Sequence, residues 1–179
     1  MMSFPSLIPE FYERSKDSAV THKPPPMIAT TPIPDRPHTI IFCCIDGRID
    51  PIRMFNLKFQ DAIVIRNAGC VMPRMINDLL VLDQVADLRE ILVISHTDCG
   101  LTHVTDDIVH TSLKERNPGH DEEIDSIPIG SFKDHVARVK SDVEYIKSHP
   151  FVRKEFHSHI HGAVYDIQTG KLTKVELDE

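Results

Sequence analysis

Three short, nearly continuous runs of β-branched and other apolar residues stand out in the first two thirds of the chain. They cover residues 39–45, 62–65 and 91–95, and longer mixed segments separate them. Strands covered on both faces of a parallel sheet have this composition, whereas strands with one face in water alternate between apolar and polar residues. The pattern therefore predicts an α/β fold with a central, mostly parallel β-sheet flanked by helices.

Two of the longer segments predict helices. Residues 74–88 carry apolar side chains with a period of about 3.6 residues, at positions 75, 76, 79, 82, 85 and 86, and Pro73 suits a helix start. A second helix is predicted over residues 132–148, with Ser131 as its N-cap, Asp134 in a capping-box-like pair and Pro150 beyond its end. Its inward-facing residues would be Val136, Val139, Val143 and Ile146.

The two ends of the chain differ from this pattern. Eight of the 13 prolines lie within the first 37 residues, and proline removes backbone donors and disfavours helix in the residue before it. We interpret residues 1–37 as an extended arm with a short helix near Pro9, whose apolar side chains would need the surface of a second subunit. Residues 38–179 would form a single domain, closed by an edge hairpin over residues 163–175.

Composition excludes several classes of protein. A chain of 179 residues with 41% hydrophobic and 26% charged residues is typical of a single globular domain. The net charge of -7 argues against nucleic-acid binding, which usually needs a basic surface. No apolar run approaches the roughly 18 residues of a membrane span, and the N-terminus does not resemble a secretory signal. We expect a cytoplasmic protein that binds neither nucleic acid nor membrane.

The four cysteines, at positions 43, 44, 70 and 99, are too sparse for a disulfide scaffold and indicate metal or redox chemistry. Thiolate and neutral imidazole are the preferred zinc ligands, and a catalytic zinc keeps three protein ligands. Cys44 closes the first apolar run, and His96 and Cys99 follow the third. In α/β sheets ligands bind at the carboxyl ends of strands, so these three residues are predicted to bind Zn²⁺.

Two charged residues follow Cys44 at alternate positions. In an extended chain, residues 44, 46 and 48 share a face, so Asp46 and Arg48 would point the same way as the ligand. Arg48 can hold Asp46 in a bidentate pair, which favours the ionised carboxylate beside the metal.

Three segments together resemble the β-class carbonic anhydrases: Cys44-x-Asp46-x-Arg48, Arg66-Asn67-Ala68-Gly69 and His96-x-x-Cys99-Gly100. The similarity extends from about residue 39 to 112, and residues 162–172 resemble the end of short family members. The resemblance implies a zinc enzyme that interconverts carbon dioxide and bicarbonate and works as a homodimer or homotetramer, with active sites at subunit boundaries. It also implies the residue roles: Cys44, His96 and Cys99 as ligands, with Asp46 and Arg48 as the adjacent dyad.

The chemistry expected of such a site is specific. Zinc lowers the pKa of its bound water from about 15.7 toward about 7, which makes hydroxide available at neutral pH to attack carbon dioxide. Asp46 would accept a hydrogen bond from this zinc-bound hydroxide and orient it. An Asp46 released from Arg48 would instead occupy the fourth zinc position, as in some family members. Ala68 and Gly69, after the second strand, are expected to let backbone donors approach the substrate.

Several alternatives stay open. Carbonyl sulfide hydrolases resemble the same family, so COS or CS₂ is an alternative substrate, and a non-enzymatic zinc-stabilised binding protein is a second alternative. Cys70 is either a fourth thiolate that closes a structural site or a small buried side chain, and Cys43 is expected to pack in the core. His103 is either a proton relay or a surface histidine.

Two further segments have competing interpretations. The three histidines of residues 157–161 offer an alternative second metal site, although solvated side chains are the simpler interpretation. Residues 113–130 indicate a polar surface excursion, in which the acidic residues would form a solvated loop: Asp121, Glu122, Glu123 and Asp125.

Overall fold

The computed structural model describes residues 5–32 and 35–177, and the chain divides into two compact units, Met1–Pro32 and Ile33–Glu179. Parts of the predicted arm, residues 1–4 and 33–34, lie outside the described residues. The first unit contains helix α1 (Ile8–Val20) and a 3₁₀ turn, η1 (Ile28–Thr30). Helix α1 forms where the sequence predicts a short helix near Pro9, with proline in its first turn and no buried residue.

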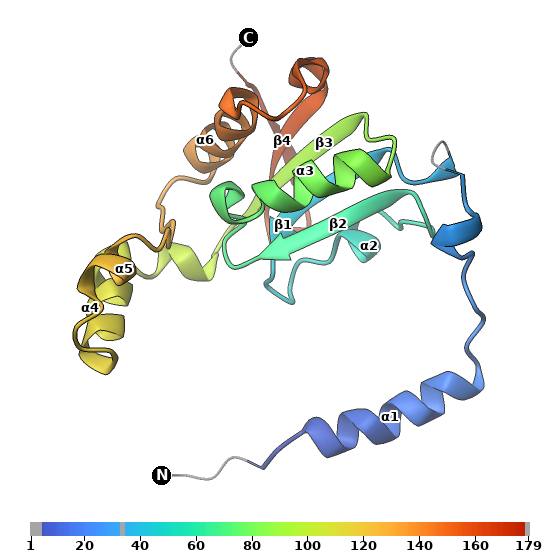
Figure 1. The fold of residues 1–179 in the computed structure, drawn as a ribbon, viewed down its shortest axis with the longest axis horizontal. Helices are drawn as coiled ribbons and strands as arrows, with labels where there is room; N and C mark the ends of the chain where they lie inside the picture. The colour runs from blue at the N-terminus through green and yellow to red at the C-terminus, as the bar shows by residue number, and fades with distance from the viewer. Residues whose placement is uncertain (1–4, 33–34, 178–179) are drawn as a thin grey trace. The chain divides into compact units, whose positions relative to one another are not determined.

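A five-stranded sheet organises the second unit (Figure 1). Strands β1 (Thr39–Cys44), β2 (Ala62–Asn67), β3 (Glu90–His96) and β4 (Ile160–Tyr165) pair in parallel in the order β2-β1-β3-β4. Strand β5 (Leu172–Val175) adds to β4 in the antiparallel sense at the edge. The α/β class, the three predicted strands and the C-terminal edge hairpin are confirmed, but only β1 and β3 are buried as predicted: β2 lies at the other edge of the sheet and is half-buried throughout.

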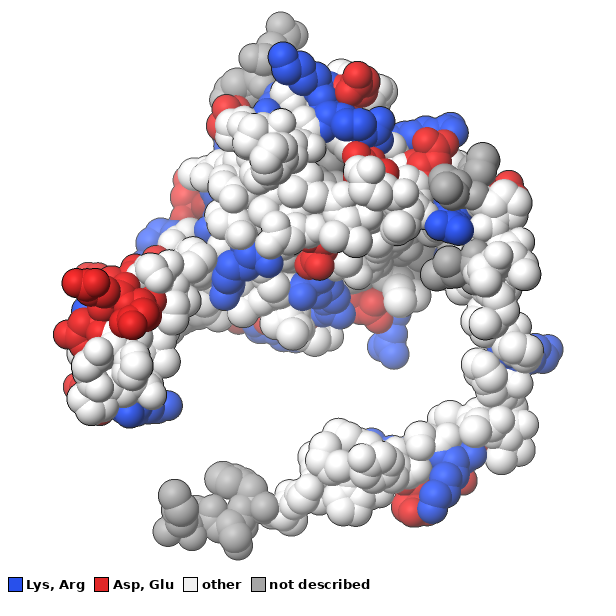
Figure 2. Space-filling view, in the orientation of Figure 1, with Lys and Arg blue, Asp and Glu red and all other residues white. Residues whose placement is uncertain are grey.

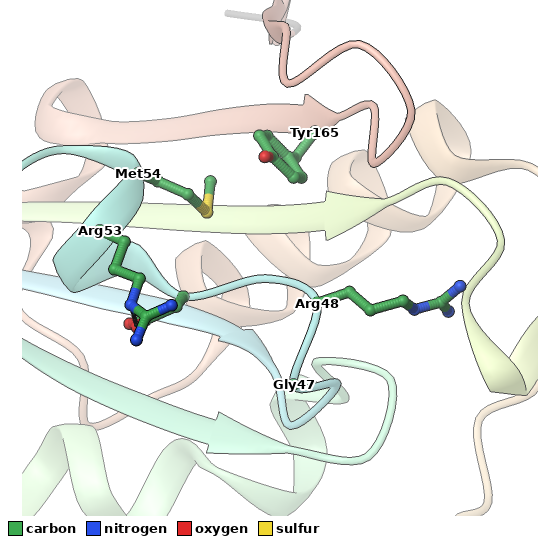
Figure 3. Close-up of a pocket in the computed structure, with 6 residues that line it drawn as sticks. Gly47, Arg48, Arg53, Met54 and Tyr165 are labelled. Carbon is green, nitrogen blue, oxygen red and sulfur yellow. Dashed lines mark ion pairs between the residues drawn. The ribbon is translucent and has the colours of Figure 1, made fainter.

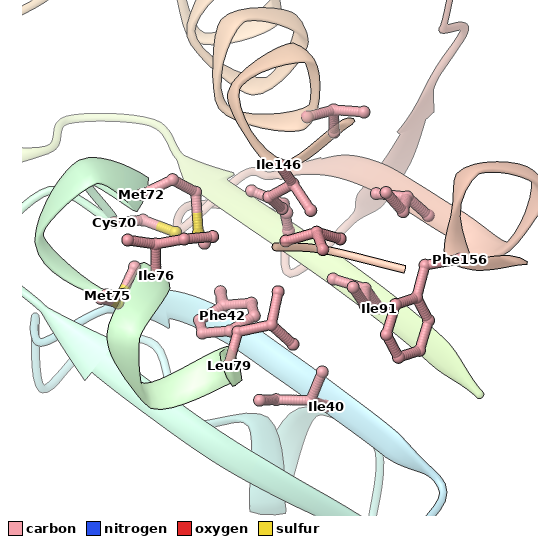
Figure 4. Close-up of a cluster of buried hydrophobic side chains, with 14 of the residues drawn as sticks. Ile40, Phe42, Cys70, Met72, Met75, Ile76, Leu79, Ile91, Ile146 and Phe156 are labelled. Atoms are coloured by element: carbon pink, nitrogen blue, oxygen red, sulfur yellow. The ribbon is translucent and has the colours of Figure 1, made fainter. Parts of the chain in front are cut away.

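Apolar side chains cover both faces of the sheet, which explains the continuous apolar runs. On one face, Ile40 and Phe42 of β1 join the larger cluster, to which α3 (Ile76–Val85) and α6 (His135–Ser148) also contribute (Figure 4). On the other face, Ile41 and Cys43 join a smaller cluster that includes residues of α2 (Pro51–Met54) and of the segment after it.

The first helix prediction, over residues 74–88, was too long. The chain makes a 3₁₀ turn, η3 (Met72–Arg74), and α3 begins only at Ile76. The helix ends at Val85 because Ala86 is already extended, with φ -134° and ψ 158°. Val85, the last residue of the helix, is 45% exposed, whereas Ile76 and Leu79 face the core as expected.

The predicted N-cap of α6 was also wrong. Asp134 caps this helix, because its carboxylate accepts hydrogen bonds from the backbone N–H groups of Val136 and Ala137. The backbone N–H of Ser131 instead donates to Asp106. Val136 is 47% exposed rather than inward-facing, while the three other residues predicted to face inward are buried: Val139, Val143 and Ile146.

The predicted surface excursion, residues 113–130, contains the last turn of helix α4 (Asp106–Arg116) and the whole of α5 (Asp121–Asp125). Thr105 caps α4, and Lys114 pairs with Asp125 across the two helices. The acidic cluster of α5 is therefore helical rather than a loop, and Figure 2 shows acidic side chains gathered there. Two 3₁₀ segments, η4 (Gly100–Thr102) and η5 (Lys154–His159), lie in the same unit. Among the described residues, no helix is both long and apolar enough to cross a membrane.

Candidate metal centre

The candidate site lies where the order of the strands reverses. Cys44 is the last residue of β1 and His96 the last residue of β3, and these two strands are parallel neighbours. The chain proceeds from β1 to β2 on one side and places β3 on the other, so the carboxyl ends of β1 and β3 form a switch point of the kind at which α/β sheets bind ligands. Cys99 follows three residues after His96.

The predicted ligands come together. The Sγ atoms of Cys44 and Cys99 and a ring nitrogen of His96 all lie within 4.8 Å of one another, and the two sulfurs are 3.9 Å apart. In the part of the chain that the structure describes, this is the one group of Cys, His, Asp and Glu side chains close enough to hold a metal ion. Cys44, Cys99 and His96 are 5%, 1% and 0% exposed, respectively, so packing holds them in place.

The hydrogen bonding of His96 tests whether a metal fits this group. Its Nδ1 lies 3.0 Å from the backbone oxygen of Thr97, and a carbonyl oxygen only accepts, so Nδ1 carries the proton. Nε2 is then an unprotonated acceptor, and it is buried with no hydrogen-bond partner. A buried acceptor without a partner is costly, and a metal ion satisfies it. The residues present therefore fit a bound metal.

The surroundings of Cys44 favour its thiolate. Cys99 lies within hydrogen-bond distance of Cys44 Sγ, and this contact lowers the pKa of the Cys44 thiol. The backbone N–H of Gly69 also donates to Cys44 Sγ, at 3.3 Å. A thiolate is the form that binds zinc.

Gly69 occupies a position that other residues do not fit. Its φ is +80°, and a Cβ built there would lie 2.2 Å from Cδ1 of Leu101. The absence of a side chain lets the N–H of Gly69 reach Cys44 Sγ. Its neighbour Ala68 uses its carbonyl oxygen to accept a hydrogen bond from Arg74. The predicted contact of Ala68 and Gly69 with substrate stays a prediction.

Asp46 and Arg48 form the bidentate pair that the sequence predicts. Arg48 Nε lies 3.0 Å from Asp46 Oδ1, and Nη2 lies 2.6 Å from Oδ2. These bonds hold the pKa of Asp46 at about 2, so the carboxylate is ionised. The backbone differs from the predicted extended chain, since β1 ends at Cys44 and the N–H of Arg48 donates to Asp46 Oδ1 in a turn.

Arg66 holds this turn in place, a role that the sequence analysis missed. Its Nε donates to the carbonyl oxygen of Cys44, and its Nη2 donates to those of Asp46 and Ile49, at distances from 2.7 to 3.0 Å. The residue stands in the Arg-Asn-Ala-Gly motif, but the motif alone does not show which carbonyls the guanidinium reaches. Arg66 thus fixes the backbone on both sides of the Asp46–Arg48 pair.

The other residues singled out from the sequence lie outside the metal group. Cys43 is fully buried, as expected, and burial raises its pKa to about 12. Cys70 packs in the larger hydrophobic cluster beside α3 (Figure 4), and burial raises its pKa, so it is a core side chain and not a fourth ligand. His157 has a buried Nε2 with no partner, but no second metal group forms among the described residues.

A cavity of about 400 Å³ opens beside Arg48 (Figure 3). In Figure 3 the Arg48 side chain extends away from Met54 and Tyr165, toward the segment after β3. Arg53 pairs with Asp50 at 3.5 Å. The cavity is lined by Gly47, Arg48, Asp50, Arg53, Met54 and Tyr165.

Known proteins resemble this chain in sequence and in fold. A sequence model of the carbonic anhydrase family matches residues 39–172. β-Carbonic anhydrase 1 of Mycobacterium tuberculosis is 36% identical over 148 residues, which cover 80% of this chain and 85% of that protein. The carbon disulfide hydrolase of Saccharolobus solfataricus is 29% identical over 163 residues, which cover 79% of each chain.

A solved structure agrees with the sequence matches. The carbonic anhydrase of Streptococcus mutans superposes with a TM-score of 0.79 at 26% identity, covering 97% of this chain and all of that one. The family model spans most of the sequence. The chain therefore belongs to the β-carbonic anhydrase family, which includes the zinc-dependent carbonate dehydratases.

Proposed function

We propose that the protein catalyses the reversible hydration of carbon dioxide to bicarbonate, with Zn²⁺ held by Cys44, His96 and Cys99. The observation that carries the proposal is the buried Cys-His-Cys group, in which His96 Nε2 has no hydrogen-bond partner. Three protein ligands leave one coordination position for water or substrate, which distinguishes a catalytic zinc from a structural one. Membership of the family supports the same reaction.

Each residue of the site has a distinct task in this proposal. Zinc bound there acts as a Lewis acid that lowers the pKa of water toward neutrality. Asp46, kept ionised by Arg48, accepts a hydrogen bond from the reacting water and directs its lone pair at carbon dioxide. Hydration adds the oxygen of water to the carbon, releases bicarbonate and transfers one proton to solvent.

The N–H of Gly69 supports the ligand shell by donating to Cys44 Sγ. The backbone at Ala68 and Gly69 is also the proposed substrate contact. His103 is 65% exposed at its side chain, which suits either proton exchange with solvent or a plain surface position.

The test combines a metal assay with stopped-flow hydration of carbon dioxide. We expect about one zinc per chain in the wild type, loss of zinc in Cys44→Ser, and retained zinc with a kcat lowered about 10- to 100-fold in Asp46→Asn. Cys43→Ser is the matched control, since Cys43 is buried beside Cys44 but lies outside the metal group. A fully active Asp46→Asn variant would contradict the assigned role of the carboxylate.

A second candidate is hydrolysis of CS₂ or COS at the same site. It is favoured by relatives named as carbon disulfide hydrolases, at 24% to 29% identity. Hydrogen sulfide release from CS₂ or COS, measured on the zinc-loaded protein beside carbon dioxide hydration, separates the two. Stoichiometric zinc without either activity would favour a zinc-stabilised binding protein.

We also propose a homodimer or homotetramer in the cytoplasm. Exposed apolar side chains on and before α1 support a partner surface, because apolar groups gain from removal from water: Leu7, Ile8, Phe11 and Tyr12. The free thiols of all four cysteines suit a reducing compartment. Light scattering of the wild type and of a variant lacking residues 1–20 tests the assembly, and an unchanged mass after truncation would contradict the role of the arm.

A further inference from the structure

A second carboxylate contacts the guanidinium of Arg48. Asp98 Oδ2 accepts a hydrogen bond from Arg48 Nη1 at 2.7 Å, and the backbone oxygen of Asp98 accepts one from Nη2 at 2.8 Å. Asp46 occupies the other donors, Nε and part of Nη2. Arg48 is therefore held from two sides, by a residue of the β1 loop and by a residue of the β3 loop.

The backbone of Asp98 has an unusual conformation for this contact. Its φ is +54°, in the left-handed region that residues with a Cβ rarely adopt, although aspartate tolerates it better than most. Such conformations cost free energy and persist where the surrounding structure holds them, often at functional positions. Here the conformation accompanies a contact in which both the carboxylate and the backbone oxygen of Asp98 face Arg48.

His103 holds the remaining oxygen of this carboxylate. Its Nε2 lies 2.8 Å from Asp98 Oδ1, and because an ionised carboxylate only accepts, the imidazole donates. The contacts thus run in series from Asp46 through Arg48 and Asp98 to His103. Without Asp98, the Asp46 carboxylate would be the one remaining side chain that holds this guanidinium among the described residues, and the side chain of Arg48 is 49% exposed to competing water.

We propose that Asp98, supported by His103, is a positioning residue that holds Arg48 in the orientation that keeps Asp46 beside the metal position. The proposal rests on the proposed function of the site. Asp98 acts through Arg48, since its hydrogen bonds run to Arg48 and His103 and not to a ligand atom. Its removal should leave zinc bound and change how tightly Arg48 and Asp46 are paired.

The first test measures the pair directly and needs no turnover. In protein labelled with ¹⁵N-arginine, the Nε–H signal of Arg48, assigned by its loss in Arg48→Lys, reports hydrogen exchange at the atom that donates to Asp46. We expect exchange to be about fivefold faster in Asp98→Asn and in Asp98→Gly, which tolerates the positive φ, with an unchanged zinc content. Exchange unchanged in both variants would overturn the proposal.

The second test is a double-mutant cycle on kcat. Asp98→Asn should lower kcat about fivefold in the wild type and have almost no effect in an Asp46→Asn background, because the carboxylate that Arg48 positions is then gone. Equal losses in both backgrounds would contradict a role through Asp46. His103→Ala should give a smaller loss of about twofold, and Glu144→Gln, which removes an equal charge from α6, should leave both readouts unchanged.

The two proposals fail in different ways. A wild-type zinc protein that does not hydrate carbon dioxide would contradict the proposed function, while the exchange of Arg48 Nε–H would still test Asp98. Normal hydration with unchanged exchange in the Asp98 variants would retain the function and reject the positioning role. The melting temperature should shift by no more than about 2 °C, because exposed ion pairs add little to stability.

Discussion

The candidate site has two halves that are held together differently. The three proposed ligands are at most 5% exposed, and the sheet and its clusters fix them. The charged half, Arg48 and Asp98, has side chains 49% and 54% exposed, and direct hydrogen bonds between charged groups orient it. The difference indicates that the two halves have different roles. Burial keeps the metal position rigid, and the exposed pair of Arg48 and Asp98 orients the Asp46 carboxylate beside it.

The largest expected effect comes from the buried half. Replacing His96 with glutamine should lower zinc affinity by more than about 100-fold, because it removes the unpartnered Nε2 acceptor from the group. Competition with a chromogenic chelator measures this loss. His110→Gln is the matched control, since His110 lies on α4 outside the metal group and its loss should leave zinc affinity unchanged. Equal affinities for wild type and His96→Gln would exclude His96 as a ligand.

A steric change at Gly69 tests how rigid the buried half is. Gly69→Ala should lower the free energy of unfolding by about 2–3 kcal/mol, since it combines a positive φ with a Cβ 2.2 Å from Leu101 Cδ1. Urea denaturation measures the loss. Gly170→Ala supplies the control, because Gly170 has φ +72° but its nearest atom would be 3.8 Å away, so it should lose only about 1 kcal/mol.

The contribution of Leu101 can be separated in the same series. In a Leu101→Ala background, Gly69→Ala should lower the free energy of unfolding by less than it does in the wild type, because the steric contact with Leu101 is gone. The part of the loss that is due to the positive φ should remain. Equal losses in the free energy of unfolding for Gly69→Ala and Gly170→Ala would show that the Leu101 side chain moves aside at little cost. The buried half would then be less rigid than its packing indicates.

Arg66 joins the two halves, because it holds the backbone between Cys44 and Ile49. Arg66→Lys keeps the charge but cannot span three carbonyl oxygens, so the free energy of unfolding should fall by about 2 kcal/mol and kcat about tenfold, with zinc retained. Denaturation and stopped-flow hydration measure both. Arg89→Lys, an exposed arginine paired with Asp87, should change neither by a comparable amount. A variant that lost zinc would place Arg66 in support of the ligands rather than of the turn.

The buried half was also the half that could be predicted from sequence. Continuous apolar runs identify β1 and β3, and cysteine and histidine at their carboxyl ends identify the ligands, because parallel strands bring those ends together. The pairing of Asp46 with Arg48 was predicted from an extended backbone that does not form, since the chain turns at Asp46. The spacing of Asp46 and Arg48 therefore predicted the correct pair, but the turn that brings the two side chains together was not predicted.

The contacts that could not be predicted depend on backbone conformation and on long-range reach. The role of Asp98 requires a positive φ that no sequence pattern here indicates, and that of Arg66 requires three carbonyls in one turn. The N-cap of α6 was misplaced for a similar reason. Ser131 and Asp134 are both good capping residues, and the contact of Ser131 with Asp106, 25 positions away, decided between them.

The smallest effect is expected at a carboxylate outside both halves. A hydrogen bond from the side chain of Ser131 lowers the pKa of Asp106, and the carboxylate also accepts hydrogen bonds from the backbone N–H groups of Ser131 and Gly130, which act in the same direction. A carboxyl whose pKa is lower in the folded state stabilises the fold above its unfolded pKa of about 3.9 and loses that contribution as pH falls through the folded value. Asp106→Asn should therefore cost about 1 kcal/mol at pH 7 and progressively less as pH falls below about 3.9.

Urea unfolding of wild type and Asp106→Asn across this pH range measures the difference, and a cost that persists at the acid end would show that the charge of Asp106 is not what stabilises the loop. The exchange of Arg48 Nε–H should stay at its wild-type rate in the same variant. Asp98 and Asp106 both accept hydrogen bonds with their carboxylates, but their substitutions should differ in effect. Asp98→Asn should speed the exchange of Arg48 Nε–H with little change in the free energy of unfolding. Asp106→Asn should lower the free energy of unfolding and leave that exchange rate unchanged. If both variants changed the same one of these two quantities, the contact of Asp98 with Arg48 would not differ in role from the contacts that stabilise the fold. The distinction between a rigid set of ligands and a separately oriented carboxylate would then be wrong.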